Sequence, residues 1–70
     1  MSDEIKNEIS ELESNIQSLT DELSNISSQI ASYGAKGDDV MKEYYEYEYR
    51  NLNSRLRGME GRLKNLLSKI

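Results

Sequence analysis

The sequence predicts an all-α fold, a two-helix antiparallel coiled-coil hairpin that assembles into a four-helix or larger homo-oligomeric bundle. Three observations predict it. Apolar residues repeat with heptad spacing in two long runs, a short glycine-containing segment separates the runs, and the runs match when one is folded back on the other. With 70 residues the chain is too short for two domains, so residues 1–70 are expected to form a single helical hairpin.

The first helix is expected over residues 3–33. Its apolar residues are separated by alternating steps of four and three, which is the spacing of a coiled-coil seam. They are Ile5, Ile9, Leu12, Ile16, Leu19, Leu23, Ile26, Ile30 and Tyr33. Ser2, Asp3 and Glu4 suit the helix N-terminus, because a hydroxyl can cap it and negative charge is favourable there.

A turn is expected over residues 34–38. Gly34 is expected to take the left-handed conformation that closes the first helix, since glycine adopts it without a steric penalty. Asp38 or Asp39 is expected to cap the second helix. These residues predict a tight reversal of the chain.

The second helix is expected over residues 39–70. Its seam repeats the steps of four and three. The seam residues are Tyr45, Tyr49, Leu52, Leu56, Met59, Leu63, Leu66 and Ile70. Each helix has about 30 residues and would be about 45 Å long at 1.5 Å per residue.

The two seams match in one antiparallel register. Residue pairs that face each other in such a register have a constant sum of residue numbers, and eight apolar pairs satisfy this condition. They are Ile30/Tyr45, Ile26/Tyr49, Leu23/Leu52, Leu19/Leu56, Ile16/Met59, Leu12/Leu63, Ile9/Leu66 and Ile5/Ile70. Beyond them the seam is expected to fray at Tyr33 and Lys42.

Charge favours the same pairing of helices. Residues 1–33 carry seven acids and one base, whereas residues 50–70 carry six bases and one acid. In this register Glu8 is expected near Lys69 and Glu22 near Arg55. Such exposed ion pairs contribute about 0.2–1 kcal/mol each, so they select the orientation of the helices more than they stabilise the fold.

The face of the second helix opposite its seam has no charged residue. We call it the uncharged stripe, and it consists of Val40, Tyr44, Tyr47, Asn51, Ser54, Gly58, Gly61, Asn65 and Ser68. Two glycines within one turn cost about 1 kcal/mol each relative to alanine, which favours a role in close packing. The residues Val40 to Gly61 of the stripe are therefore the expected self-association or partner face. Two copies would form a homodimer about a twofold axis near Asn51, with the bulky end of one stripe on the small end of the other.

Four of the five tyrosines lie within residues 44–49, and basic residues flank them. Aromatic faces beside cationic side chains can stack a nucleotide base and bind its phosphate. The candidate ligand residues are Tyr44, Tyr47, Arg50 and Lys42. The alternative interpretation is an interface role, which the composition of protein interfaces favours for tyrosine.

Arg50, Arg57 and Lys64 are spaced by seven and form a basic ridge, which makes them the candidate nucleic-acid contacts. The net charge of −4 and the acidic first helix oppose this role. A nucleic-acid-binding dimer is therefore the third hypothesis.

The composition excludes several chemistries. Cys and His are absent, so there is no thiol or imidazole for catalysis and no zinc site of the usual kind, and no metal or cofactor is expected. We expect a soluble, acidic, cytoplasmic and non-enzymatic protein with no membrane partner, because neither a signal peptide nor a transmembrane segment is recognisable. The first hypothesis is a self-associating hairpin that binds another protein as an adaptor, assembly element or inhibitor. The alternative is an oligomer that sequesters a small ligand or nucleotide between protomers.

Overall fold

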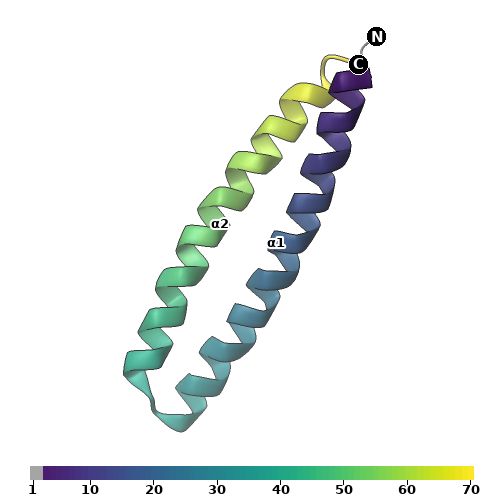
Figure 1. The fold of residues 1–70 in the computed structure, drawn as a ribbon. Coiled ribbons are helices and arrows are strands. Elements are labelled where there is room, and N and C mark those ends of the chain that lie inside the picture. The colour runs from purple at the N-terminus through teal and green to yellow at the C-terminus, as the bar shows by residue number, and fades with distance from the viewer. Residues whose placement is uncertain (1–2) are drawn as a thin grey trace.

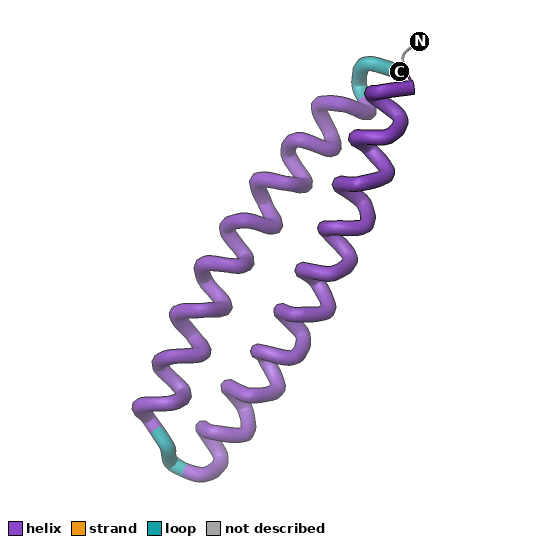
Figure 2. The backbone as a smooth tube through the Cα atoms, viewed as in Figure 1, coloured by secondary structure: helices purple, strands orange, loops and turns teal. Residues whose placement is uncertain are grey.

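The computed structural model describes residues 3–70 and consists of two helices, α1 (Asp3–Lys36) and α2 (Asp39–Leu67). The helices run antiparallel and lie side by side along their whole length (Figures 1 and 2). The molecule is a rod of 54 × 14 × 12 Å. The predicted all-α class and the helical hairpin are therefore confirmed.

The reversal between the helices is shorter than predicted and uses a different glycine. α1 continues to Lys36, and Gly37 has the positive φ, +74°, whereas Gly34 is helical. The Gly37 amide donates to the Gly34 carbonyl at 3.2 Å and the Asp38 amide donates to the Tyr33 carbonyl at 2.9 Å. This pair of bonds is the Schellman motif, which places the left-handed residue just after the helix. The assignment of Gly34 to that role was wrong.

Asp38 begins α2. Its side chain accepts a hydrogen bond from the Met41 amide at 3.2 Å, and its carbonyl accepts from the Lys42 amide at 3.0 Å. One residue thus completes the end of α1 and caps the start of α2. Because this cap must directly precede α2, the chain reverses at Gly37 rather than at Gly34. The prediction that Asp38 or Asp39 caps the helix is confirmed, with Asp38 as the residue.

The core lies along the predicted seam. Leu19, Leu23, Ile26 and Leu52 form a buried cluster at mid-length. Partly buried seam residues pack against this cluster, namely Ile30, Tyr45, Leu56 and Met59. Ile9 and Leu66 are buried nearer the open end of the hairpin. The heptad residues therefore supply the interface between the helices, as the periodicity predicts.

The seam differs from the prediction at both of its ends. α2 ends at Leu67, and Ile70 is 61% exposed, so the predicted Ile5/Ile70 layer is wrong. The Ser68 hydroxyl donates to the Asn65 carbonyl at 2.6 Å, a local bond that competes with helix continuation. At the turn, Tyr33 does not fray, because its ring stacks on Tyr45 with centroids 5.6 Å apart. The proposed Ser2 cap lies outside the described residues.

Ionic contacts between the helices also differ from the prediction. Arg62 of α2 binds Glu8 of α1, with both Nε (2.9 Å) and Nη2 (2.5 Å) donating to Oε2. Glu8 thus pairs with Arg62 instead of Lys69. Glu22 and Arg55, both in the described part of the chain, form no ion pair. An acidic residue of α1 still pairs with a basic residue of α2, which agrees with the expected orientation but shifts the partner by one heptad.

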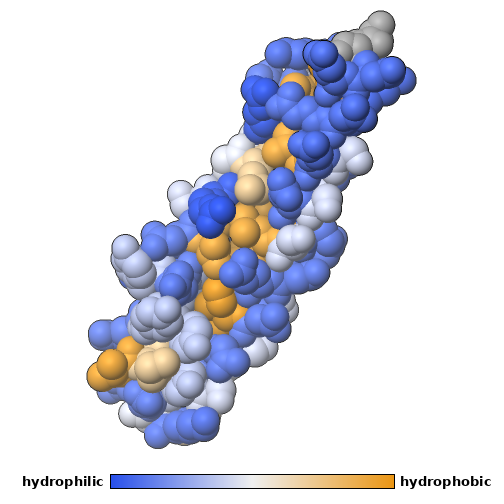
Figure 3. Space-filling model, in the orientation of Figure 1, coloured by the Kyte–Doolittle hydropathy of each residue, from blue (hydrophilic) through white to orange (hydrophobic). Residues whose placement is uncertain are grey.

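The space-filling view shows hydrophobic residues along the line where the helices meet, between hydrophilic residues on both sides (Figure 3). Neither helix in residues 3–70 is long and apolar enough to cross a membrane.

Candidate protein-interaction face

The bulky half of the uncharged stripe lies on the surface of α2. Val40 is 77% exposed, Tyr44 52% and Tyr47 59%, although each is a large side chain with apolar surface. The heptad spacing causes this, because seam residues turn toward α1 and the positions between them turn away from it. The hairpin alone leaves these three side chains without an apolar partner on their outer side.

The small half of the stripe is also open. Asn51, Ser54, Gly58 and Gly61 are all exposed. A Cβ atom built on Gly58 or Gly61 meets nothing within 4 Å. The packing of α1 on α2 therefore does not require glycine at either position. The two residues weaken the helix without a compensating contact inside this chain.

The tyrosines near the turn form one aromatic cluster. Tyr45 stacks on Tyr33, and Tyr44 meets the Tyr45 ring edge-on with centroids 5.1 Å apart. The ammonium of Lys36 lies 5.3 Å from the centre of the Tyr33 ring. A hydrogen bond to Glu48, with the negative charge of that carboxylate, raises the pKa of Tyr44 above 10.0. Tyr44, although exposed, therefore contacts Tyr45 through its ring and Glu48 through its hydroxyl.

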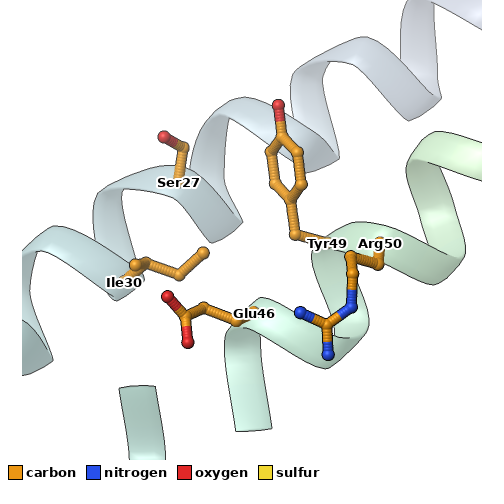
Figure 4. Close-up of a pocket in the computed structure, with 5 residues that line it drawn as sticks. All are labelled: Ser27, Ile30, Glu46, Tyr49 and Arg50. Atoms are coloured by element: carbon orange, nitrogen blue, oxygen red, sulfur yellow. The ribbon is translucent and has the colours of Figure 1, made fainter. Parts of the chain in front are cut away.

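A shallow hollow of about 330 Å³ lies between the helices on a seam edge (Figure 4). Its lining consists of Ser27, Ile30, Glu46, Tyr49 and Arg50. It combines an apolar surface, an aromatic ring, a carboxylate and a guanidinium. In chemical terms it could take a small planar molecule that carries an anionic group.

The predicted ligand residues are not assembled in this hollow. Of Tyr44, Tyr47, Arg50 and Lys42, only Arg50 lines it. Lys42 instead packs across the turn, where its Cδ would lie 3.7 Å from a Cβ on Gly34. The ring nearest Arg50 in the hollow belongs to Tyr49, a seam residue that is 36% exposed.

The basic ridge is an exposed feature of α2, with Arg50, Arg57 and Lys64 all on the surface. Arg62, which the sequence analysis did not single out among the site residues, is bound to Glu8. Residues 3–70 contain no group of three or more His, Cys, Asp or Glu side chains that could hold a metal ion.

Sequence reasoning missed the hollow because heptad periodicity identifies the seam residues but not how completely they fill the edge of the seam. A signal was present, since Ser27 directly follows the seam residue Ile26 of α1 and Glu46 directly follows the seam residue Tyr45 of α2. A short serine at this flank leaves the edge of the seam uncovered. Extending the antiparallel register to the positions beside the seam would have placed Ser27 and Glu46 on the same edge.

Comparisons with family models, curated proteins and solved structures find no match to this chain.

Proposed function

We propose that this chain is a non-enzymatic, self-associating interaction protein, an adaptor, assembly element or inhibitor that binds another protein through the surface of its hairpin. The observation that carries the proposal is the outward face of α2. There Val40, Tyr44 and Tyr47 are exposed on a stripe without charge. Tyrosine supplies large, rigid contact area and a hydroxyl that tolerates water, which is why interfaces are enriched in it.

The small core supports the same proposal. Six apolar residues of the described chain are buried, and none is completely inaccessible. A hairpin of this size gains little stabilisation per ordered residue from one narrow seam. Covering the stripe with another protein surface would bury further apolar area and stabilise the helices.

The test is the double variant Tyr44→Ala/Tyr47→Ala, measured by light scattering after size-exclusion chromatography over a concentration series. We expect wild type to exceed the monomer mass of 8.1 kDa and the variant to remain monomeric. Helicity should be retained, because both side chains are more than half exposed. A monomeric wild type at every concentration would contradict self-association.

Tyr45→Ala is the matched control. Tyr45 packs on the core cluster and stacks on Tyr33, so its loss should lower the free energy of unfolding by about 1–3 kcal/mol, less than for a fully buried aromatic residue. Urea unfolding followed by circular dichroism would measure the difference. If Tyr44→Ala/Tyr47→Ala destabilised the hairpin as much as the control, the stripe would be part of the core.

Binding of a small anionic ligand such as a nucleotide is the second candidate function, and the hollow at Arg50 and Tyr49 favours it. A ligand that binds only the folded protein raises the melting temperature, by an amount that corresponds to about 2.7 kcal/mol at 100 times its dissociation constant. Melting with a nucleotide panel, on wild type and Arg50→Gln, tests this candidate. A shift that persists in Arg50→Gln would place the ligand elsewhere.

A further inference from the structure

The two halves of α2 carry opposite charge. Residues 39–49 contain four acids and one base, a net charge of −3, whereas residues 50–67 contain five bases and one acid, a net charge of +4. The acidic α1 lies beside both halves, so it complements only the basic one. A second α2 in antiparallel orientation would complement both halves at once.

The uncharged stripe is complementary to itself in the same orientation. One antiparallel register places every stripe position between Val40 and Asn65 opposite another stripe position. The facing pairs are Val40/Asn65, Tyr44/Gly61, Tyr47/Gly58 and Asn51/Ser54. Both tyrosines, the two largest side chains of the stripe, then face glycines whose outer side is open. In this arrangement the glycines make room for the partner's tyrosines, whereas in the single hairpin nothing packs against them.

From these two observations we infer that the partner of the stripe is a second copy of this chain, bound α2 against antiparallel α2 about a twofold axis that passes between Asn51 and Ser54. The inference rests on the proposed function and specifies its first partner. The axis falls at the middle of α2 (Asp39–Leu67), so the two helices overlap completely. The four helices then form a flat row with α1 on both outer sides, rather than a square bundle.

Charged positions beside the stripe fit this register. Glu43 of one copy lies near Lys64 of the other, and Glu48 lies near Arg55, and the twofold axis repeats each pair. The unfavourable contacts are close to the axis, where Arg50 approaches Arg57. Near the axis the attraction of Glu48 to Arg55 offsets this repulsion, and the Glu43–Lys64 pairs toward both ends of the interface favour the full overlap over a register shifted along the helix.

A second copy could instead cover the seam edge at the hollow, which would make a four-helix bundle. That edge carries the carboxylates of Glu46, Glu13 and Glu60 and the guanidinium of Arg50, charges that a second copy would have to desolvate. The stripe has no charge to desolvate and exposes larger apolar side chains. The balance of desolvation and apolar burial therefore favours the stripe.

A charge exchange tests the register. Glu43 and Lys64 are exposed and do not flank the seam, so their variants leave the hairpin intact. Glu43→Lys and Lys64→Glu should each weaken association by about 2- to 30-fold, because each variant removes two symmetry-related ion pairs. The double variant Glu43→Lys/Lys64→Glu should recover wild-type association. A double variant that associates no better than the single ones overturns the register.

Cross-linking through single cysteines tests which faces meet, since the natural chain has no Cys. With a short bis-maleimide, Asn51→Cys should yield covalent dimer rapidly. Asn25→Cys, on the exposed surface of α1, is the matched control and should yield little. Asn53→Cys, on the seam edge, should react more slowly than Asn51→Cys.

The outcomes separate the inference from the proposed function. Faster dimer formation by Asn53→Cys than by Asn51→Cys would overturn the row of helices, whereas self-association would stand. A monomeric mass for all variants and for wild type would overturn both. Rapid cross-linking at Asn51 with restored association in the charge-exchanged variant supports the inference.

Discussion

In the proposed dimer, Gly58 and Gly61 would each serve an interface at the expense of their own helix. Glycine in a helix interior is less favourable than alanine by about 1 kcal/mol, and here no neighbour within the chain needs the space. We propose that this destabilisation of the helix is offset in the dimer, where the absence of a side chain would let the partner's helix approach closely.

The double variant Gly58→Ala/Gly61→Ala should therefore have effects of opposite sign. We expect the free energy of unfolding of the isolated hairpin to rise by roughly 1–2 kcal/mol, since each added Cβ stiffens the helix and meets nothing within 4 Å. Association should weaken, because the new methyl groups would meet the partner's tyrosines. Urea unfolding of dilute protein and light scattering of concentrated protein would measure the two effects.

Ser24→Ala on the exposed surface of α1 is the matched control, with a smaller gain in stability and unchanged association. If Gly58→Ala/Gly61→Ala associated as tightly as wild type, the two glycines would not be needed for close packing between copies.

At the scale of elements, the connection between α1 and α2 depends on two residues with different tasks. Gly37 supplies the left-handed conformation, and Asp38 supplies the cap of α2 and a backbone amide for the end of α1. If a neighbouring residue took the left-handed conformation or capped α2 instead, the length of α1 would change.

Asp38→Ala should lower the free energy of unfolding by about 1 kcal/mol through loss of the cap, within a range of about 0.5–2 kcal/mol. Gly37→Ala should also destabilise the hairpin, because alanine is strained at a φ of +74°. Gly34→Ala should be neutral or stabilising, since Gly34 is helical and the nearest atom to its added Cβ is at 3.7 Å. Thermal unfolding followed by circular dichroism ranks the three, and a Gly34→Ala variant as unstable as Gly37→Ala would contradict this account of the turn.

The elements also show how far sequence reasoning reaches. Heptad periodicity predicted both helices and the residues that meet between them, because burial of an apolar face dominates the pairing of long helices. The left-handed glycine was misplaced because two glycines were available, and the Asp38 cap, a short-range hydrogen bond, selects between them. The Ile5/Ile70 layer failed because the last residues lack helical neighbours, so local bonds at Ser68 determine the end of α2.

The candidate site was predictable only in part. The exposure of Val40, Tyr44 and Tyr47 follows directly from their place opposite the seam. The hollow depends on how far Ile30 and Tyr49 fill the edge of the seam, which periodicity does not specify. The ligand residues predicted from their proximity in the sequence therefore do not line one site, since only Arg50 lines the hollow.

For the whole molecule, size and shape limit the stability of a single copy. A rod 54 Å long and 14 Å wide has a large surface for its volume, and its core is a single line of side chains. Stability is therefore expected to depend on association, as it does in proteins whose protomers complete each other's core.

The melting temperature should accordingly rise with protein concentration, by roughly 5–10 °C over a 100-fold range, since the native complex is favoured by mass action. Circular dichroism in cells of different path length would measure it. Tyr44→Ala/Tyr47→Ala should melt at one temperature throughout, and a wild type that does the same would mean that the hairpin is stable alone.

Because the chain runs up one helix and back down the other, the two ends of the rod differ. Residues 3 and 70 lie together at one tip and the turn lies at the other, up to 54 Å away (Figure 1). In a pair of antiparallel copies, each end of the rod would carry the turn of one copy and the chain ends of the other. Whatever is attached to the ends of the two chains would then be held apart by the length of a hairpin and face opposite directions. A parallel pair would instead cluster both attachments at a single point.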